Sequence, residues 1–206
     1  VDILLDPGHG SQDPGAIGQN GTKEKDINLK ISLKVGKLLN ERDVSIAYTR
    51  TTDILLGTNV NLDLKERVRL ANEVYKPKYF VSIHNNAHSS PSAKGTETYI
   101  VGKGGNAEKL AQKVHPSLIK STGLYDRGIK TANFYVLKYT DMPAILIECA
   151  FLSNPDEEKL LNDDNFLNKI AEGIAKGICE FLGKKWEMEM PVSDAWKWAL
   201  NLGIVK

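Results

Sequence analysis

Two histidines lie at, or three residues beyond, the positions that follow apolar runs typical of β-strands. His9 follows the run Val1–Leu5 within the motif DPGHG at residues 6–10, and His84 follows the run Tyr79–Ile83. Such runs, bounded by turn-forming or polar residues, predict buried strands. Because open α/β folds keep their chemistry at the carboxyl ends of strands, we expect both imidazoles at the rim of a sheet.

These histidines indicate a catalytic zinc site. Hydrolytic zinc usually takes three protein ligands and keeps one position for water, and two histidines with one glutamate form an established set. His9, Glu24 and His84 would supply it. From the residues alone, however, Glu24 lies at the start of a predicted helix. A carboxylate there interacts favourably with the helix dipole, and that structural role is the favoured interpretation.

Glu148 is the best candidate for a proton-transfer group. It emerges from the apolar run Ala144–Cys149, and burial raises the pKa of a carboxyl group toward a useful range. Asp6 has two interpretations. It either orients His9 or a neighbouring backbone group as a hydrogen-bond acceptor, or it simply forms a turn beside Pro7.

The remaining candidates are expected to be structural. His88 follows His84 by four residues, but a strand end and a polar loop separate them, so His88 is expected to be an exposed loop residue. His115 precedes Pro116 and is expected at the surface or in a cap, and Glu97 is expected to be structural. No GxSxG nucleophile motif occurs in the chain.

Composition excludes several classes of function. The 206 residues carry 27 basic and 26 acidic side chains without a run of like charges, so nucleic acid is not an expected partner. No stretch approaches the about 20 consecutive apolar residues that cross a membrane. Cys149 and Cys179 lie in apolar segments and are interpreted as core residues, although a disulfide between them stays open.

Hydrophobic periodicity predicts a single α/β domain. We expect a twisted, mostly parallel or mixed sheet of about six strands with helices on both faces. One helix runs from Asp26, one begins with Asp63 as its cap, and one covers Asn106–Thr122 with a kink or break at Pro116. The last covers Phe166–Phe181. The expected strands are Val1–Leu5, Val44–Thr49, Tyr79–Ile83, Thr96–Val101, Asn133–Leu137 and Ala144–Cys149.

The ordered motifs resemble a known family of zinc enzymes, the N-acetylmuramoyl-L-alanine amidases of the amidase-3 type. The resemblance covers roughly residues 1–183 and implies an endolysin or autolysin catalytic domain. It rests on the residues Leu5–Gly10, Glu24 before Asn28 and Leu29, Ser82–Ala87, Asp126–Ile129, Ile147–Glu148 and Phe151–Asn154.

The resemblance implies that one zinc ion is held by His9, Glu24 and His84 and that Glu148 is the catalytic residue. It thereby favours Glu24 as a ligand over its helix-start role. The implied reaction is hydrolysis of the amide between the lactyl group of N-acetylmuramic acid and the L-alanine of the stem peptide. Motif position further suggests that Arg127 holds a substrate carboxylate and that Asn86 hydrogen-bonds substrate or shapes the site.

The expected partner is peptidoglycan, and the expected location is the cell wall or the extracellular space, reached by secretion or at lysis. We expect a monomer with no membrane or nucleic-acid partner. Division-associated relatives carry a long helical insertion that blocks the site, whereas residues 102–126 here hold little more than one helix. An open groove is therefore expected.

Residues 184–206 are expected to form a linker and a short helix. That helix either packs on the domain of residues 1–183 or begins a wall-binding module. Two rival functions also stay open. One is a zinc exopeptidase-like enzyme, which would release free amino acids, and the other is a catalytically inactive peptidoglycan-binding protein.

Overall fold

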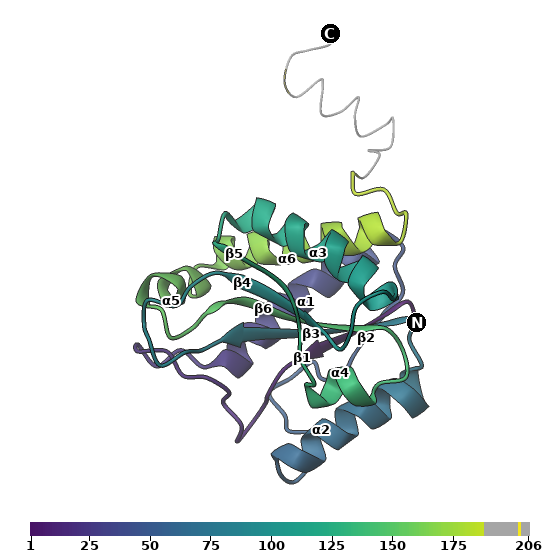
Figure 1. The fold of residues 1–206 in the computed structure, drawn as a ribbon, viewed down its shortest axis with the longest axis horizontal. Helices are drawn as coiled ribbons and strands as arrows, with labels where there is room; N and C mark the ends of the chain where they lie inside the picture. Colours follow the sequence, from purple (N-terminus) through teal and green to yellow (C-terminus); the bar gives the residue numbers. More distant parts are fainter. Residues whose placement is uncertain (188–201, 203–206) are drawn as a thin grey trace.

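The apolar runs assemble into one six-stranded sheet with the order β2-β1-β3-β6-β4-β5. The computed structural model describes residues 1–187 and 202 (Figure 1). Neighbouring strands are parallel except β4 and β6, which are antiparallel. The strands are β1 (Ile3–Pro7), β2 (Ile46–Tyr48), β3 (Tyr79–Asn86), β4 (Thr96–Ile100), β5 (Asp126–Thr131) and β6 (Ala144–Phe151).

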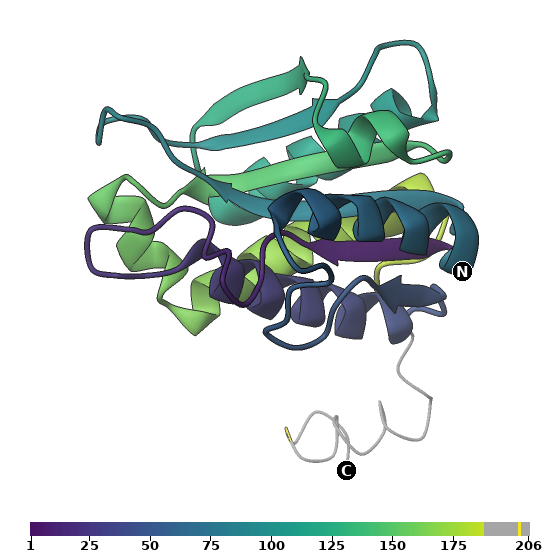
Figure 2. The same ribbon diagram turned by 90° about the horizontal axis from the view of Figure 1, so that it is seen from below.

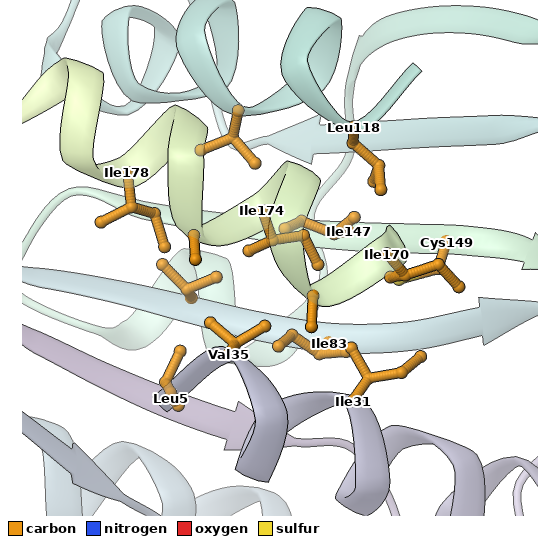
Figure 3. Packing of buried hydrophobic residues seen from close by; sticks show 14 of the residues in the cluster. Leu5, Ile31, Val35, Ile83, Leu118, Ile147, Cys149, Ile170, Ile174 and Ile178 are labelled. Carbon is orange, nitrogen blue, oxygen red and sulfur yellow. The ribbon is translucent and has the colours of Figure 1, made fainter. Parts of the chain in front are cut away.

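Three long helices cover one face of the sheet: α1 (Glu24–Asn40), α3 (Asn106–Thr122) and α6 (Asp164–Phe181). Their apolar stripes pack on the strands, because residues spaced at helical period share one side of a helix. Figure 3 shows this core, in which the labelled residues include Ile31, Val35, Leu118, Ile174 and Ile178 from the helices and Leu5, Ile83 and Ile147 from the strands.

The opposite face carries α2 (Val60–Arg69), its π-helical continuation η1 (Leu70–Tyr75) and the short α4 (Tyr135–Tyr139) (Figures 1 and 2). A smaller apolar cluster lies beneath them and includes Leu4, Phe80 and Leu146. The helix α5 (Pro155–Leu161) follows β6. The predicted α/β fold with a mixed six-stranded sheet and helices on both faces is confirmed.

One predicted strand is wrong. The segment predicted as the strand Asn133–Leu137 contains the start of α4, and the polar segment Asp126–Thr131 forms the strand β5 instead. Val136 and Leu137 are only 4% and 3% exposed, because α4 covers the apolar cluster on that face. Tertiary packing here overrides the β-propensity of the apolar residues.

Two helices also differ from expectation. The helix predicted to begin at Asp63 begins at Val60, and the Asn59 side chain caps it by accepting a hydrogen bond from the Leu62 backbone N–H at 3.0 Å. The predicted break at Pro116 is absent, since α3 continues through it. α6 approaches this part of α3 so closely that a Cβ on Gly177 would lie 2.5 Å from the Cα of Val114.

Both cysteines are buried and free, as expected for core residues. Among the described residues, no helix has the length and apolarity needed to cross a membrane. The short helix expected within residues 184–206 lies mainly outside the described residues. The described part of that segment includes Trp186, whose ring stacks 3.8 Å from the Arg42 guanidinium.

Candidate active site

The parallel strands β1, β3 and β6 bring the candidate residues to one edge of the sheet. His84 on β3 lies in register with Glu148 on β6, and Pro7 at the end of β1 lies in register with Ile83. His9 follows two residues later. The sequence-based expectation that both imidazoles lie at the rim of the sheet is therefore met.

Two buried arginines hold the backbone that carries His9. Arg50 Nε donates to the Pro7 carbonyl at 3.0 Å and its Nη2 donates to the Gly8 carbonyl at 3.0 Å. Arg67 Nη1 and Nη2 each donate at 2.8 Å, to the carbonyls of Pro7 and His9 respectively. His9 itself has a left-handed backbone with φ of 63°. These bonds to three successive carbonyls stabilise a conformation that is uncommon for a residue with a side chain.

Asp6 does not orient the His9 imidazole. Its Oδ1 accepts from Arg67 Nη1 at 2.6 Å and from Thr49 Oγ1 at 2.7 Å, and its Oδ2 accepts from Ser82 Oγ at 2.7 Å. Burial alone would raise the pKa of Asp6, but Arg67 and these hydrogen bonds outweigh it and lower the pKa. Asp6 acts on the backbone indirectly, through the arginine.

Asp13 takes the role that the sequence suggested for Asp6. Its Oδ2 lies 2.7 Å from Nδ1 of His9, so the other ring nitrogen, Nε2, faces the site. Sequence reasoning missed this residue. The only available signal was that Asp13 is the sole acidic residue in the polar loop of residues 11–22.

Glu24 bridges the two imidazoles. Its Oε2 lies 3.2 Å from His9 Nε2, and its Oε1 lies 2.9 Å from His84 Nδ1. One candidate ligand atom from each residue lies within 4.8 Å of the others. The two rings meet edge to face with their centroids 5.0 Å apart. Glu24 is indeed the first residue of α1, but its carboxylate points into this cluster.

Neighbouring donors fix the Glu24 carboxylate. Oε2 accepts from the Ala16 N–H at 2.8 Å, and Oε1 accepts from the Asn85 N–H at 3.1 Å and from Asn28 Nδ2 at 3.2 Å. Burial would raise the pKa of Glu24, yet hydrogen bonds to His84 and His9 hold it well below its ordinary value. Burial would likewise lower the pKa of His9, but Glu24 and Asp13 raise it to about 9.

The Glu148 carboxyl completes the arrangement. Its Oε2 is buried with no hydrogen-bond partner among the described residues. Burial and the negative charges of Glu24 and Glu97 raise the pKa of Glu148 well above its ordinary value. An unpartnered buried oxygen is unusual in a folded protein and marks a place where an additional group would bind.

The three converging side chains fit a zinc ion. Two histidines and a glutamate match the donor chemistry that zinc prefers in hydrolases, and Asp13 orients one histidine as such ligands commonly require. The raised pKa of His9 and the lowered pKa of Glu24 are the signs of a buried carboxylate that attracts positive charge. A cation at this place would satisfy the same attraction.

Arg127 and Asn86 share one partner, Glu97. Glu97, directly opposite Glu148 in the β4–β6 pair, accepts hydrogen bonds from Asn86 Nδ2 at 3.1 Å and from Arg127 Nε. The side-chain oxygen of Asn86 accepts from the Ala87 N–H at 2.8 Å. The expected structural role of Glu97 is thus to hold polar side chains next to the site.

The other two histidines lie outside the cluster. His88 is exposed in the loop after β3, as expected. His115 is 3% exposed, so the expected surface position is wrong. Its two ring nitrogens lie 2.9 Å from Thr98 Oγ1 and 2.8 Å from Asp126 Oδ1, which makes it a link between α3 and strands β4 and β5.

A cleft of about 320 Å³ adjoins the cluster and is lined by His9, His84 and Glu148. The cleft also has an apolar lining from α2, β6 and the region of α4, which includes Val60, Leu64, Phe134, Val136 and Leu146.

A second cavity of about 470 Å³ lies between α3 and α6 and is lined by none of the candidate site residues.

Sequence comparison finds relatives of this chain. The chain is 39% identical over 181 residues to the N-acetylmuramoyl-L-alanine amidase LytC of Bacillus subtilis (strain 168), and this match covers 87% of the chain and 35% of LytC. It is 43% identical over 190 residues to the endolysin of Bacillus phage SPP1, and this match covers 89% of the chain and 66% of the endolysin. The chain thus spans about a third of the length of LytC and about two thirds of the length of the endolysin.

A solved structure is also similar. The catalytic domain of CwlV, an N-acetylmuramoyl-L-alanine amidase from Bacillus (Paenibacillus) polymyxa var. colistinus, matches with a TM-score of 0.81 and 40% identity, over 89% of this chain and 98% of that one. Residues 3–180 match the family Amidase_3, described as N-acetylmuramoyl-L-alanine amidase. This chain therefore belongs to the amidase-3 family of N-acetylmuramoyl-L-alanine amidases.

Proposed function

We propose that this chain hydrolyses the amide bond between the lactyl group of N-acetylmuramic acid and the L-alanine of the stem peptide in peptidoglycan. The observation that carries the proposal is the convergence of His9, Glu24 and His84 beside Glu148, in a chain of the amidase-3 family. The relatives are cell-wall amidases and a phage endolysin, which supports action on the bacterial wall after secretion or at lysis.

In this proposal His9, Glu24 and His84 hold one zinc ion. When bound, zinc supplies Lewis-acid chemistry, which activates water and polarises the scissile carbonyl. The chain's own contribution is to keep these ligands in place before substrate arrives. Asp13 keeps Nε2 of His9 facing inward, and the donors around Glu24 keep both of its oxygens directed at the imidazoles.

Glu148 is proposed as the general base and acid. It accepts a proton at its carboxyl oxygen from the attacking water and hands that proton to the nitrogen of the leaving L-alanine. A raised pKa suits this task, because the carboxyl group must hold the proton between the two steps. The unpartnered Oε2 is an available place for it.

Arg127 is proposed to bind a substrate carboxylate, and Asn86 to shape the site next to Glu148. The guanidinium side chain is partly exposed, with 31% of its surface accessible, and is held by Glu97. Asn86 uses both ends of its amide within the protein, which supports the shaping role over direct contact.

We further propose that a monomer acts with a permanently open groove. Between β4 and β5 the chain holds the single helix α3, which lies on the face of the sheet opposite the cleft. No described segment between these strands therefore covers the proposed ligands. A purified chain that stays strongly inhibited until a partner is added would contradict this proposal.

The test is digestion of purified peptidoglycan followed by mass spectrometry of the released products. The proposal predicts intact stem peptides with a free L-alanine amino terminus and glycan strands that keep the lactyl carboxylate. Release of single amino acids would instead indicate an exopeptidase. Binding to the wall without release of peptides would indicate a non-catalytic protein.

A further inference from the structure

A cluster of two cations around one buried carboxylate lies next to Glu148. Glu97 is 2% exposed. Its Oε1 accepts from Lys130 Nζ at 2.6 Å and from Arg127 Nε, and its Oε2 accepts from the Tyr99 hydroxyl at 2.5 Å. We call Glu97, Arg127 and Lys130 the cation cluster. Its one anion fixes two cations in place, so the cluster carries a net charge of +1.

Both cations face solvent while they are held. The side chains of Arg127 and Lys130 are 31% and 37% exposed, whereas that of Glu97 is 3% exposed. The Arg127 guanidinium also lies over the Phe151 ring, 4.9 Å from its centroid. A pair of ordered, exposed cations is prepared to bind an anion, because little side-chain entropy is lost when the anion arrives.

Strand register places the cation cluster on the same face as the proposed active site. Glu97 is directly opposite Glu148, and Tyr99, two residues further along β4, is directly beside Lys130 of β5. Opposed residues on paired strands point to the same face. Neighbouring strands are about 4.8 Å apart, and β5 is the second strand from β6, so the backbone that carries both cations lies about two strand spacings from Glu148. An extended peptide covers that distance in about three residues.

We propose that the cation cluster binds a carboxylate of the stem peptide, on the second or third residue after the muramic acid. Lys130 is a specificity-determining residue in this site, and Glu97 is a positioning residue that holds both cations. This inference rests on the proposed amidase function. It excludes stem peptides amidated at this position as preferred substrates, because a carboxamide has no negative charge to pair with the two cations.

The test uses synthetic muramyl tripeptides that differ only in two carboxyl groups, one on the second residue and one on the third. The α-carboxylate of a γ-linked D-glutamate at the second residue is kept or replaced by a carboxamide. Independently, a third residue with a side-chain carboxylate is compared with its amidated form. For the wild type we expect kcat/KM to fall about 10- to 100-fold when the recognised carboxylate is amidated. The arm that shows the fall identifies which residue supplies the carboxylate.

Variants separate recognition from structural support. In Lys130→Gln the preference for the carboxylate substrate is expected to shrink, because only Arg127 remains to pair with it, and Lys130→Arg is expected to retain the preference in full. Lys34→Gln is the matched control, since Lys34 pairs with Asp164 at 2.9 Å on the other side of the sheet, and it should keep the full preference. Equal kcat/KM for all substrates in the wild type, or an undiminished preference in Lys130→Gln, would overturn the proposal.

Calorimetric binding of the free stem tripeptides distinguishes this inference from the proposed function. Tighter binding of the carboxylate peptide, weakened in Lys130→Gln, supports the cation cluster even in a chain that cleaves nothing. Cleavage of all four substrates at equal rates, with equal binding of the peptides, supports the amidase function and overturns the carboxylate site.

Discussion

Glu24 connects the residue-scale features of the site, because its two carboxylate oxygens face two different imidazoles. Oε1 and Oε2 lie 2.9 Å and 3.2 Å from nitrogens of His84 and His9. Each oxygen also accepts at least one backbone N–H. A carboxylate with this many fixed donors cannot rotate away, so the proposed ligands are held in place by the protein itself.

Asp13 offers a test of this preorganisation. Asp13→Asn keeps the shape of the side chain but removes the charge that orients Nδ1 of His9. We expect zinc affinity to fall about 10- to 100-fold, as measured by competition with a chelator of known affinity. Asp2→Asn, which alters an ion pair with Lys78 away from the site, serves as the control. Unchanged zinc affinity in Asp13→Asn would show that the contact at 2.7 Å has no role in metal binding.

The lowered pKa of Glu97 predicts that the stability of the fold depends on pH. Burial would raise its pKa, but hydrogen bonds from Lys130, Tyr99 and Arg127 outweigh burial and lower the pKa from 4.5 to about 2. The folded pKa lies below the unfolded one, so this carboxylate stabilises the fold above about pH 4.5. Its contribution is lost as the pH falls toward about 2.

The measurement is urea unfolding of the wild type and Glu97→Gln at several pH values. The difference in the free energy of unfolding should be constant above about pH 5 and shrink progressively toward about pH 2. A difference that stays constant across this window would contradict the assigned pKa.

How far the site could be predicted differs from residue to residue. The strand-end positions of His9 and His84 follow from apolar runs alone. Glu24 required the resemblance, because a glutamate at a helix start has an ordinary structural explanation. Asp13 could not be predicted, since its contact depends on how the loop of residues 11–22 folds back. The arginines that hold residues 7–9 are likewise far away in the sequence.

At the scale of elements, α2 is tied to the end of β1 through Arg67. This side chain is 1% exposed and donates to Asp6 and Asp63, each at 2.6 Å, as well as to two backbone carbonyls. Its removal would leave two buried carboxylates without the cation that pairs with them. The ion pairs therefore connect a helix, a strand and the loop that carries His9.

Arg67→Met should destabilise the fold by about 3–5 kcal/mol, because buried charges lose their partner. Arg69→Met on the same helix is the matched control. Its side chain is 46% exposed and pairs with Glu66, so its loss should leave the free energy of unfolding nearly unchanged. Urea unfolding measures both values. Equal effects of the two substitutions would show that the buried network does not stabilise the chain.

Elements were predictable where one physical signal dominated. Four of the expected helices, and all of the strands except one, correspond to observed elements because their apolar periodicity reports burial directly. The prediction placed a strand at Asn133–Leu137 and missed β5, because β5 is a polar strand at the edge of the sheet. Its sequence, DRGIKT, carries little apolar alternation.

At the scale of the whole molecule, the two faces of the sheet differ: one carries the large apolar core and the other carries the candidate site. The helices α1, α3 and α6 bury the large apolar cluster on the first face. On the second face α2 and α4 cover only part of the sheet, and the cleft adjoins their residues and the end of β6. The site thus uses the less covered face, where substrate can approach without local unfolding.

The most direct measurement compares stem-peptide release from peptidoglycan with bound zinc, for the wild type and Glu148→Gln. We predict one zinc per chain in both proteins and release lowered at least about 100-fold in the variant, because the ligands remain while the proton carrier is lost. Undiminished release by Glu148→Gln would contradict the role of Glu148. A wild type that binds no zinc while it releases peptides would contradict the proposed metal site.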